Sequence, residues 1–265
     1  MVKVICPLHA QKTKTKFLFE CSPNNWAQKV SLRVVQCQKC DLIFFSPNLN
    51  PEIRKAYHNQ DYYRATEKGC IGYPDYIEEE HLSAKIYFGR LLLSWFTRLR
   101  KNKDNLLDSI IDLGCASGHM LIPFRDKGFT TVGIDFSEWA VEWGKKHLDL
   151  DLRCQDMDQL RLGKNELFDC IIFWDSLEHV QKPRKLLKIL YKHSTKDTLM
   201  IVQMPDVNQF KNDPTHPYWS LYQHSFHYTE KTLGRLLKLE GFQIHRKLPS
   251  SQSAEMLFIV TRQEK

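Results

Sequence analysis

This chain of 265 residues has no run of the roughly twenty apolar residues that a membrane-spanning helix needs. Its best candidate, residues 82–99, is interrupted by Lys85, Arg90 and Arg98. The start of the sequence also lacks the apolar core of a signal peptide, because Pro7 follows only a few residues from Met1. These absences argue against a membrane protein, and we expect a cytoplasmic one.

The eight cysteines do not suggest a disulfide framework. Cys70, Cys115, Cys154 and Cys170 are scattered, as is usual for small core or turn residues of an intracellular domain. The other four crowd into the first forty residues. That clustering requires its own explanation.

Two ligand pairs with x-x spacing stand about thirty residues apart in this segment, Cys6/His9 and Cys37/Cys40. Three thiolates and one imidazole suit tetrahedral zinc, and the spacing is that of a zinc ribbon. A piece of fifty residues with so few apolar side chains needs the stability that a metal supplies. We predict these four residues as structural zinc ligands. Cys21 is an alternative to His9, and a metal-free segment with reduced thiols is the other interpretation.

Acidic residues are scarce in the first fifty positions, where seven lysines and arginines face only Glu20 and Asp41. This segment therefore carries +5 of the net charge of +7. Such a basic segment suits contact with RNA or an acidic carrier. Because no aromatic residues alternate with the basic ones, we favour an ordinary solvated surface.

The chain also lacks the Gly-x-Gly-x-x-Gly fingerprint of dinucleotide-binding domains. The apolar run 110–113 is followed instead by Gly114, Ala116 and Gly118, and a second apolar run ends at Asp135. Small residues let the backbone approach a ligand, and an acid about twenty residues further on is placed to accept hydrogen bonds from ribose hydroxyls. The pattern predicts a nucleoside-bearing cofactor across the ends of these strands.

From residue 110 onward, apolar strand patterns alternate with helix patterns, which predicts a mostly parallel sheet covered on both faces. We expect strands near 109–113, 130–134, 151–154, 168–173, 197–203, 242–248 and 254–262. We expect helices near 78–101, 118–127, 137–147, 183–193 and 230–240, and a short one from Pro51. A hairpin joins the last two strands, so one of them is antiparallel. We divide the chain into a zinc-ribbon-like segment (1–50), a helical lead-in or lid (51–104) and a cofactor-binding domain (105–265).

The run from Asp112 to Gly118 resembles the first motif of class I S-adenosylmethionine-dependent methyltransferases, in which an acid and an apolar residue precede Gly-x-Gly-x-Gly. Ala116 departs from the middle glycine by one methyl group. The resemblance is strongest over residues 108–180, and residues 37–47 look like the zinc-binding lead-in of many such enzymes. It implies an α/β fold with a Rossmann-like seven-stranded, mostly parallel sheet and one antiparallel strand near the C-terminus, plus the small zinc-ribbon-like segment.

The resemblance further implies S-adenosylmethionine as the cofactor. Asp156 matches the acid that accepts from the adenine amino group, Met157 would lie on the adenine face, and Trp174 with Asp175 would line the methionine part. The predicted cofactor-binding residues are Asp112, Gly114, Cys115, Ala116, Gly118, Asp135, Phe136, Asp156, Met157, Trp174 and Asp175.

Titratable side chains gather between residues 216 and 229. Tyr222-Gln223-His224 is similar to the Tyr-Glu-His motif of zinc-bearing sugar C-methyltransferases, but Gln223 cannot ionise, which leaves His224 as the better base. The run 177–180 matches a segment of the ubiquinone-type and sugar-type branch, and His179 within it is either a base or held by its loop. We predict His224, His179 and Tyr222 as catalytic residues. The alternative interpretation is that the aromatic residues of this segment form a packed lid.

The resemblance favours a methyltransferase that acts on a small molecule such as a sugar, a quinone or another secondary-metabolite acceptor. An RNA methyltransferase that binds through the basic N-terminal segment is the alternative. The common forms of nucleic-acid enzyme carry Asn/Asp-Pro-Pro-aromatic or Pro-Cys motifs, which residues 174–177 and 204–206 lack. A non-enzymatic scaffold has no need of Asp135 and Asp156 beside the small-residue turn. The acceptor, the methylated atom and the oligomeric state stay open.

Overall fold

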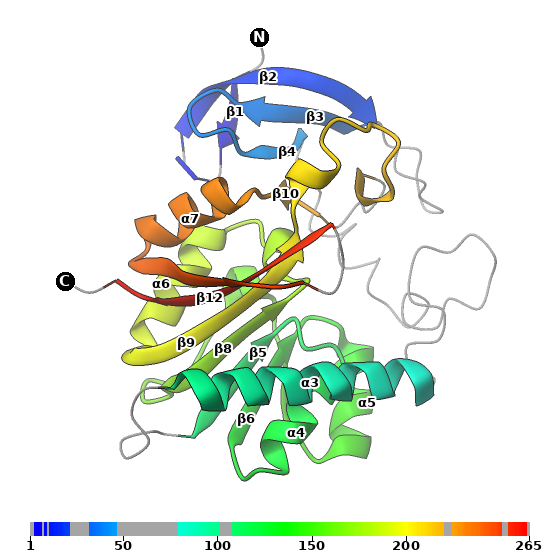
Figure 1. Cartoon of the computed structure of the whole chain (residues 1–265), viewed down its shortest axis with the longest axis vertical. Coiled ribbons are helices and arrows are strands. Elements are labelled where there is room, and N and C mark those ends of the chain that lie inside the picture. Colours follow the sequence, from blue (N-terminus) through cyan, green and yellow to red (C-terminus); the bar gives the residue numbers. More distant parts are fainter. Residues whose placement is uncertain are drawn as a thin grey trace.

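The computed structural model describes residues 3–6, 8–9, 11–21, 32–46, 79–100, 108–219, 224–250 and 254–263. Two sheets organise these residues, a seven-stranded one in the order β11-β12-β9-β8-β5-β6-β7 and a five-stranded one in the order β1-β2-β3-β4-β10 (Figure 1). The helix predicted from Pro51 lies outside the described residues.

The larger sheet is the one predicted from the sequence. Its strands are β5 (Ser109–Leu113), β6 (Thr130–Asp135), β7 (Asp151–Cys154), β8 (Phe168–Trp174), β9 (Ser194–Pro205), β11 (Phe242–Leu248) and β12 (Glu255–Arg262). Strands β5 to β9 pair in parallel, whereas β12 is antiparallel to both β9 and β11. The central strand β5 is buried along its whole length, because helices cover both faces of the sheet.

Helices pack on the two faces of this sheet (Figure 1). One face carries α3 (Glu79–Leu99), α4 (Ile122–Arg125) and α5 (Glu138–Leu148), and the other carries α6 (Pro183–Lys192) and α7 (Glu230–Leu239). Short 3-10 turns are η1 (His119–Leu121), η2 (Met157–Gln159), η3 (Leu177–His179), η4 (Val207–Gln209) and η5 (Pro217–Trp219). No helix in the described part of the chain is long and apolar enough to cross a membrane.

Local sequence signals set the ends of these helices. The Ser137 hydroxyl caps α5 by accepting from the Ala140 N–H, and Thr229 caps α7 in a capping box with Thr232. Gly241 follows α7 with φ +87°, the left-handed conformation that commonly ends a helix. These signals explain why the sequence predicted the helices of this domain to within a few residues.

The smaller sheet contains β1 (Lys3–Cys6), β2 (Gln11–Cys21), β3 (Leu32–Cys37), β4 (Ile43–Ser46) and β10 (Phe226–His227). Its fifth strand comes from the C-terminal half of the chain, with Phe226 opposite Phe44 and His227 opposite Ile43. Apolar side chains of this sheet share one core cluster with α7. The first fifty residues are therefore joined to the larger domain by both a strand pair and a common core.

Candidate functional site

The turn after β5 has the backbone that its small residues allow. Gly114, Ala116 and Gly118 have φ values of +87°, +49° and +86°. A side chain at Gly114 would place its Cβ 2.6 Å from the Cβ of Ser176, so the turn also needs glycine for space. Ala116 adopts the left-handed region despite its methyl group, at a cost of about 1 kcal/mol.

Asp135 at the end of β6 holds this turn in place. One carboxylate oxygen accepts from the Ala116 N–H at 2.9 Å, and the other accepts from the Ser137 N–H at 2.8 Å. Burial raises the pKa of Asp135, while the backbone donors oppose that shift. Because each carboxylate oxygen has two acceptor positions, both oxygens can still accept from a ligand.

The loop after β7 reaches the same edge of the sheet, since β7 is parallel to β6 and next to it. Asp156 is half-buried and caps η2 by accepting from the Asp158 N–H at 2.9 Å. The Met157 methyl group lies 3.9 Å from the position of a Cβ on Gly114. Phe136, after β6, is half-buried, and its carbonyl accepts from the Cys154 thiol. The structure thus brings Met157 to the turn.

Two other predicted cofactor residues point largely into the core. The Cys115 side chain is buried, and its sulfur lies 2.7 Å from where a Cβ on Gly133 would sit. Trp174 is half-buried at the end of β8 and packs on Phe88 of α3, with ring centroids 5.1 Å apart. The buried Cys115 thiol donates to the Ala116 carbonyl within the turn at 3.5 Å, whereas Trp174 stays partly accessible.

A lysine from α3 enters this edge of the sheet among carboxylates. Burial lowers the pKa of Lys85, and the charges of Asp175 and Asp112 oppose that shift. Burial, and then the charge of Asp135, raises the pKa of Asp112 to about 7. Burial also raises the pKa of Asp175 to about 6. A site with this excess of carboxylates favours a cationic ligand.

The predicted histidines meet around a buried acid. The Glu178 carboxylate lies 3.8 Å from Nε2 of His179 and 4.0 Å from Nε2 of His224. One ligand atom from each of the three residues fits within 4.8 Å. Burial raises the pKa of Glu178 well above its ordinary value and lowers the pKa of His224 to about 3. Tyr222, the third predicted catalytic residue, lies outside the described residues.

Several buried polar atoms near this acid have no hydrogen-bond partner among the described residues. They are the hydroxyl of Ser176, both carboxylate oxygens of Glu178, Nε2 of His227 and the hydroxyl of Tyr228. Each such group costs about 1–3 kcal/mol when it is left unpaired. So many together indicate a place where a polar ligand completes the hydrogen bonding.

Sequence reasoning missed three residues of this region. Glu178 stood beside the predicted His179, so its signal was present in the sequence. Lys85 was visible only as a charge that interrupts an apolar helix. Glu255 gave no signal, because it reaches the site only through the antiparallel direction of β12; burial, and then the charge of Asp175, raises its pKa to about 7.

The four predicted zinc ligands come together in the smaller sheet. One atom each of Cys6, His9, Cys37 and Cys40 lies within 4.8 Å of the others. The sulfur atoms of Cys6 and Cys40 are 3.6 Å apart, and this contact lowers the pKa of Cys40 to about 5. Nε2 of His9 is shielded from solvent and has no partner in the described structure. Cys21 lies at the far end of β2, in a different core cluster.

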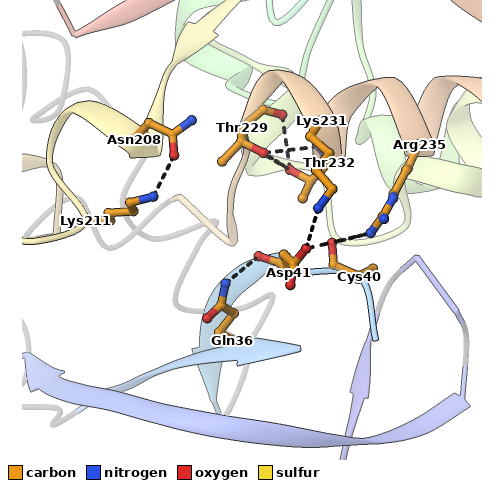
Figure 2. Close-up of polar contacts among 9 residues, drawn as sticks. All are labelled: Gln36, Cys40, Asp41, Asn208, Lys211, Thr229, Lys231, Thr232 and Arg235. Atoms are coloured by element: carbon orange, nitrogen blue, oxygen red, sulfur yellow. Dashed lines mark hydrogen bonds and ion pairs between the residues drawn. The ribbon is translucent and has the colours of Figure 1, made fainter. Parts of the chain in front are cut away.

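This cluster is docked on α7 by polar contacts as well as by the shared core. Arg235 donates to the Cys40 carbonyl at 2.9 Å, and Lys231 pairs with Asp41 at 2.9 Å (Figure 2). The Arg184 guanidinium donates to the Leu8 carbonyl from α6. Both turns of the cluster therefore touch the larger domain.

The buried Asp112 predicts a pH effect on stability without cofactor. Its pKa is about 7 when folded and 3.8 in an ordinary setting, so between these values the unfolded chain loses a proton that the folded chain keeps. This group therefore lowers stability as pH rises from 4 to 7. We expect the free energy of unfolding of Asp112→Asn, relative to that of wild type, to rise by on the order of 2 kcal/mol when the pH is raised from 4 to 7.5.

Urea unfolding at both pH values measures this gain. The matched control is Asp126→Asn, which changes an exposed carboxylate. A stability difference between Asp112→Asn and wild type that stays constant with pH would contradict the shifted pKa.

Comparison with known proteins places the chain among methyltransferases. Residues 83–247, more than half of the chain, match the family described as a methyltransferase domain. A ubiquinone biosynthesis O-methyltransferase of Coxiella burnetii is 30% identical over 84 residues, which are 30% of this chain and 36% of the relative. One of Caulobacter sp. (strain K31) is 29% identical over 98 residues, 35% and 39% of the two chains. The chain thus spans about a third of the length of these curated relatives.

Solved structures share the fold. The magnesium protoporphyrin IX methyltransferase of Synechocystis PCC 6803 with bound SAH has a TM-score of 0.58 and 18% identity, covering 81% of this chain and 100% of that one. The plantazolicin methyltransferase in complex with a substrate analogue and SAH has a TM-score of 0.57 and 16% identity, covering 80% and 96%. At these identities the likeness concerns the fold.

Proposed function

Because this chain belongs to the methyltransferase domain family, we propose that it transfers a methyl group from S-adenosylmethionine to a small acceptor that carries a hydroxyl group. One observation carries the proposal: the Asp135 carboxylate holds the Gly114–Gly118 turn, and the buried polar cluster around Glu178 lies beyond the adjacent strand end. In parallel sheets, ligands bind at this edge.

The residues at this edge suit the parts of the cofactor, which supplies a methyl group activated by a sulfonium. Asp135 would accept from the ribose hydroxyls, Asp156 from the adenine amino group, and Met157 would pack on the base. Asp112 and Asp175 would neutralise the methionine ammonium, and Lys85 would bind its carboxylate. This assignment gives Asp112, Asp175 and Lys85 an opposite charge on the ligand.

Asp135→Ala is expected to weaken S-adenosylmethionine binding by about 2 kcal/mol, or about thirtyfold, because it removes acceptors for the ribose and releases the Ala116 N–H. Titration calorimetry measures the affinity. Asp151→Ala, which changes an exposed carboxylate at the start of β7, is the control. Equal affinities of Asp135→Ala and wild type would remove Asp135 from the cofactor site.

The histidines and Glu178 would handle the proton of the acceptor. The His224 ring is neutral at neutral pH, since burial lowers the pKa of this residue to about 3, and a neutral imidazole has one nitrogen that can accept a proton. It would take the hydroxyl proton as the oxygen attacks, and the resulting imidazolium would lower the raised pKa of Glu178, 4.0 Å away, so that the two groups form an ion pair. His179, which lies 3.8 Å from the same carboxylate oxygen and has its ring centroid 4.9 Å from that of His224, would help to orient both groups.

The surroundings favour a neutral acceptor with hydrogen-bonding groups. Asp175 and Glu255, with pKa values of about 6 and about 7, are at least partly charged at neutral pH and oppose an anionic ligand. The unpaired hydroxyl of Tyr228 and Nε2 of His227 offer hydrogen-bond partners. The relatives named for ubiquinone biosynthesis O-methylation support the same class of acceptor. One ligand atom each of Glu178, His179 and His224 lies within 4.8 Å of the others, a spacing that also suits a divalent cation.

Transfer of labelled methyl groups tests the function. We expect label in a neutral phenol or alcohol when hydroxylated quinone precursors, free sugars, nucleotide sugars and RNA are offered, each with and without a chelator. Label in RNA alone would favour the RNA methyltransferase alternative. The absence of label in every acceptor, with cofactor binding intact, would contradict the proposal.

We also propose that Cys6, His9, Cys37 and Cys40 hold one structural zinc ion. The donor set suits zinc, and the unpaired, shielded Nε2 of His9 fits a metal ligand. Zinc bound there would supply folding energy. The division into a zinc-ribbon-like segment (1–50), a lead-in (51–104) and a catalytic domain (105–265) is part of this proposal.

A further inference from the structure

The outer face of β2 carries a row of like charges. Lys12, Lys14 and Lys16, here called the lysine row, occupy alternate positions, so their side chains leave the same face of the strand. All three are exposed. Alternate residues of a strand are about 7 Å apart, so the ammonium groups form a single file with a regular spacing.

The charges of the lysine row are not neutralised within the protein. Among the residues that the structure describes, no carboxylate pairs with any of the three. Glu20, the acid of the same strand, pairs with Arg33 at 3.3 Å. Lys3 lies opposite Lys14 in the register of β1 and β2, and like charges at paired positions destabilise a sheet. This repulsion between lysines is expected at a surface that binds a negatively charged partner, because the partner then neutralises it.

The strands next to the lysine row border a groove between the smaller sheet and the larger domain. Lys16 is opposite Gln36 in the register, and Gln36 is opposite Ile43. Both of these neighbours line a cavity of about 650 Å³. Its far wall is formed by the segment after β9 and the start of α7, including Asn208, Lys211, Thr229 and Lys231.

The groove combines cations with groups that suit a nucleobase. Figure 2 shows Lys211 turned to the neutral Asn208 amide, at 2.9 Å, so its charge is not cancelled. Two carboxylates also line the groove, and both are paired, Asp41 with Lys231 and Glu230 with Lys247. Lys211 is therefore the one lining cation without a carboxylate partner among the described residues. Gln36 and Asn208 carry amides that can bond to base edges, and the half-buried Ile244 offers an apolar surface for a base.

An exposed aromatic ring lies on the opposite face of β2 from the lysine row. Phe17 follows Lys16 and is 54% exposed, with the Arg33 guanidinium 6.0 Å from its ring centroid. In the described structure, β1 pairs with β2 only over residues 11–14, so the edge of β2 near Phe17 is not covered by β1. A strand bound along the lysine row could therefore stack a base on Phe17 only by passing around this open edge of β2.

We propose that the lysine row and the groove bind a single-stranded nucleic acid, whose phosphates follow the row and whose next nucleotide enters the groove. The groove favours this partner over an acidic peptide strand, because such a strand could match the spacing of the lysines but has no base to enter the groove. The site is separate from the cofactor edge, so the proposal does not depend on which molecule is methylated.

Fluorescence anisotropy with a labelled single strand of about twelve nucleotides tests the proposal. RNA and DNA of one mixed sequence are titrated with the full-length protein between 50 and 200 mM salt. We expect Lys12→Gln/Lys14→Gln/Lys16→Gln to weaken binding by at least about tenfold at low salt and to reduce the salt slope by about 2. Lys211→Gln alone should weaken binding by about threefold.

The matched control is Lys127→Gln/Lys164→Gln/Lys188→Gln, which removes three exposed lysines from the larger domain. This variant should bind the strand as wild type does, and both triple variants should keep wild-type affinity for S-adenosylmethionine. Absence of strand binding, or equal loss in the two triple variants, would overturn the proposal. Poly-glutamate that binds the lysine row more tightly than either strand would assign the surface to an acidic protein instead.

Discussion

His224→Ala is expected to lower kcat by about 10² to 10⁴ and to leave the affinity for S-adenosylmethionine unchanged. His224 is buried, and its Nε2 faces the Glu178 carboxylate at 4.0 Å. The variant removes the group that takes the acceptor proton but none of the residues assigned to the cofactor. Single-turnover methyl transfer and calorimetry on the same preparation separate the two effects.

The pH profile gives a second readout of the same residue. Because burial lowers the pKa of His224 to about 3, this group stays neutral from pH 5 to 8. A loss of activity on acidification near the ordinary histidine pKa should therefore not come from His224. His245→Ala changes an exposed histidine on β11 and should keep full activity. A His224→Ala variant that loses cofactor affinity in proportion to kcat would show a structural role instead.

Loss of the metal should have the second large effect. Cys37→Ser is expected to release one zinc ion per chain and to lower the melting temperature by about 10 °C, since structural zinc supplies a large share of the folding energy of a small metal site. The loss of stability should extend to β10, because this strand pairs with β4. Elemental analysis, thermal unfolding and hydrogen exchange at residues 32–46 and 224–228 measure the three effects.

Cys21→Ser is the matched control, because Cys21 is a buried cysteine of the same sheet outside the metal cluster. The Cys21→Ser variant should retain the metal and the hydrogen-exchange protection of β4 and β10. Purified wild-type protein that contains no zinc, with the same hydrogen-exchange protection in these strands, would contradict the metal proposal. A catalytic loss in Cys37→Ser with intact cofactor affinity would link the metal to the segment that carries His224.

The sequence predicted the larger domain well because its signals are local. Apolar runs, helix caps such as Thr229 and the turn from Gly114 to Gly118 each fix their own element, and the seven predicted strands occur in the structure. The expectation of a class I methyltransferase is confirmed by the family match and the fold. The assigned roles of Asp135, His224 and the other site residues stay predictions.

Contacts between distant segments were harder to foresee. The metal ligands could be chosen because x-x spacing is a local pattern, but nothing local says that Phe226 and His227 extend the N-terminal sheet. Likewise, the lysines of β2 read as scattered surface charge until the strand places them on one face and the register sets them beside the groove.

The sequence by itself determined the order of strands and helices, the turn at the cofactor edge and the pairing of metal-ligand types, since each depends on residues close together in the chain. Only the tertiary structure decided that two histidines contact Glu178, that Lys85 and Glu255 are close to Asp175, and that the basic strand borders a groove. The reason is physical: these contacts arise when the direction of β12, the packing of α3 and the shared core of the two sheets bring remote residues together, and no short stretch of sequence encodes that packing.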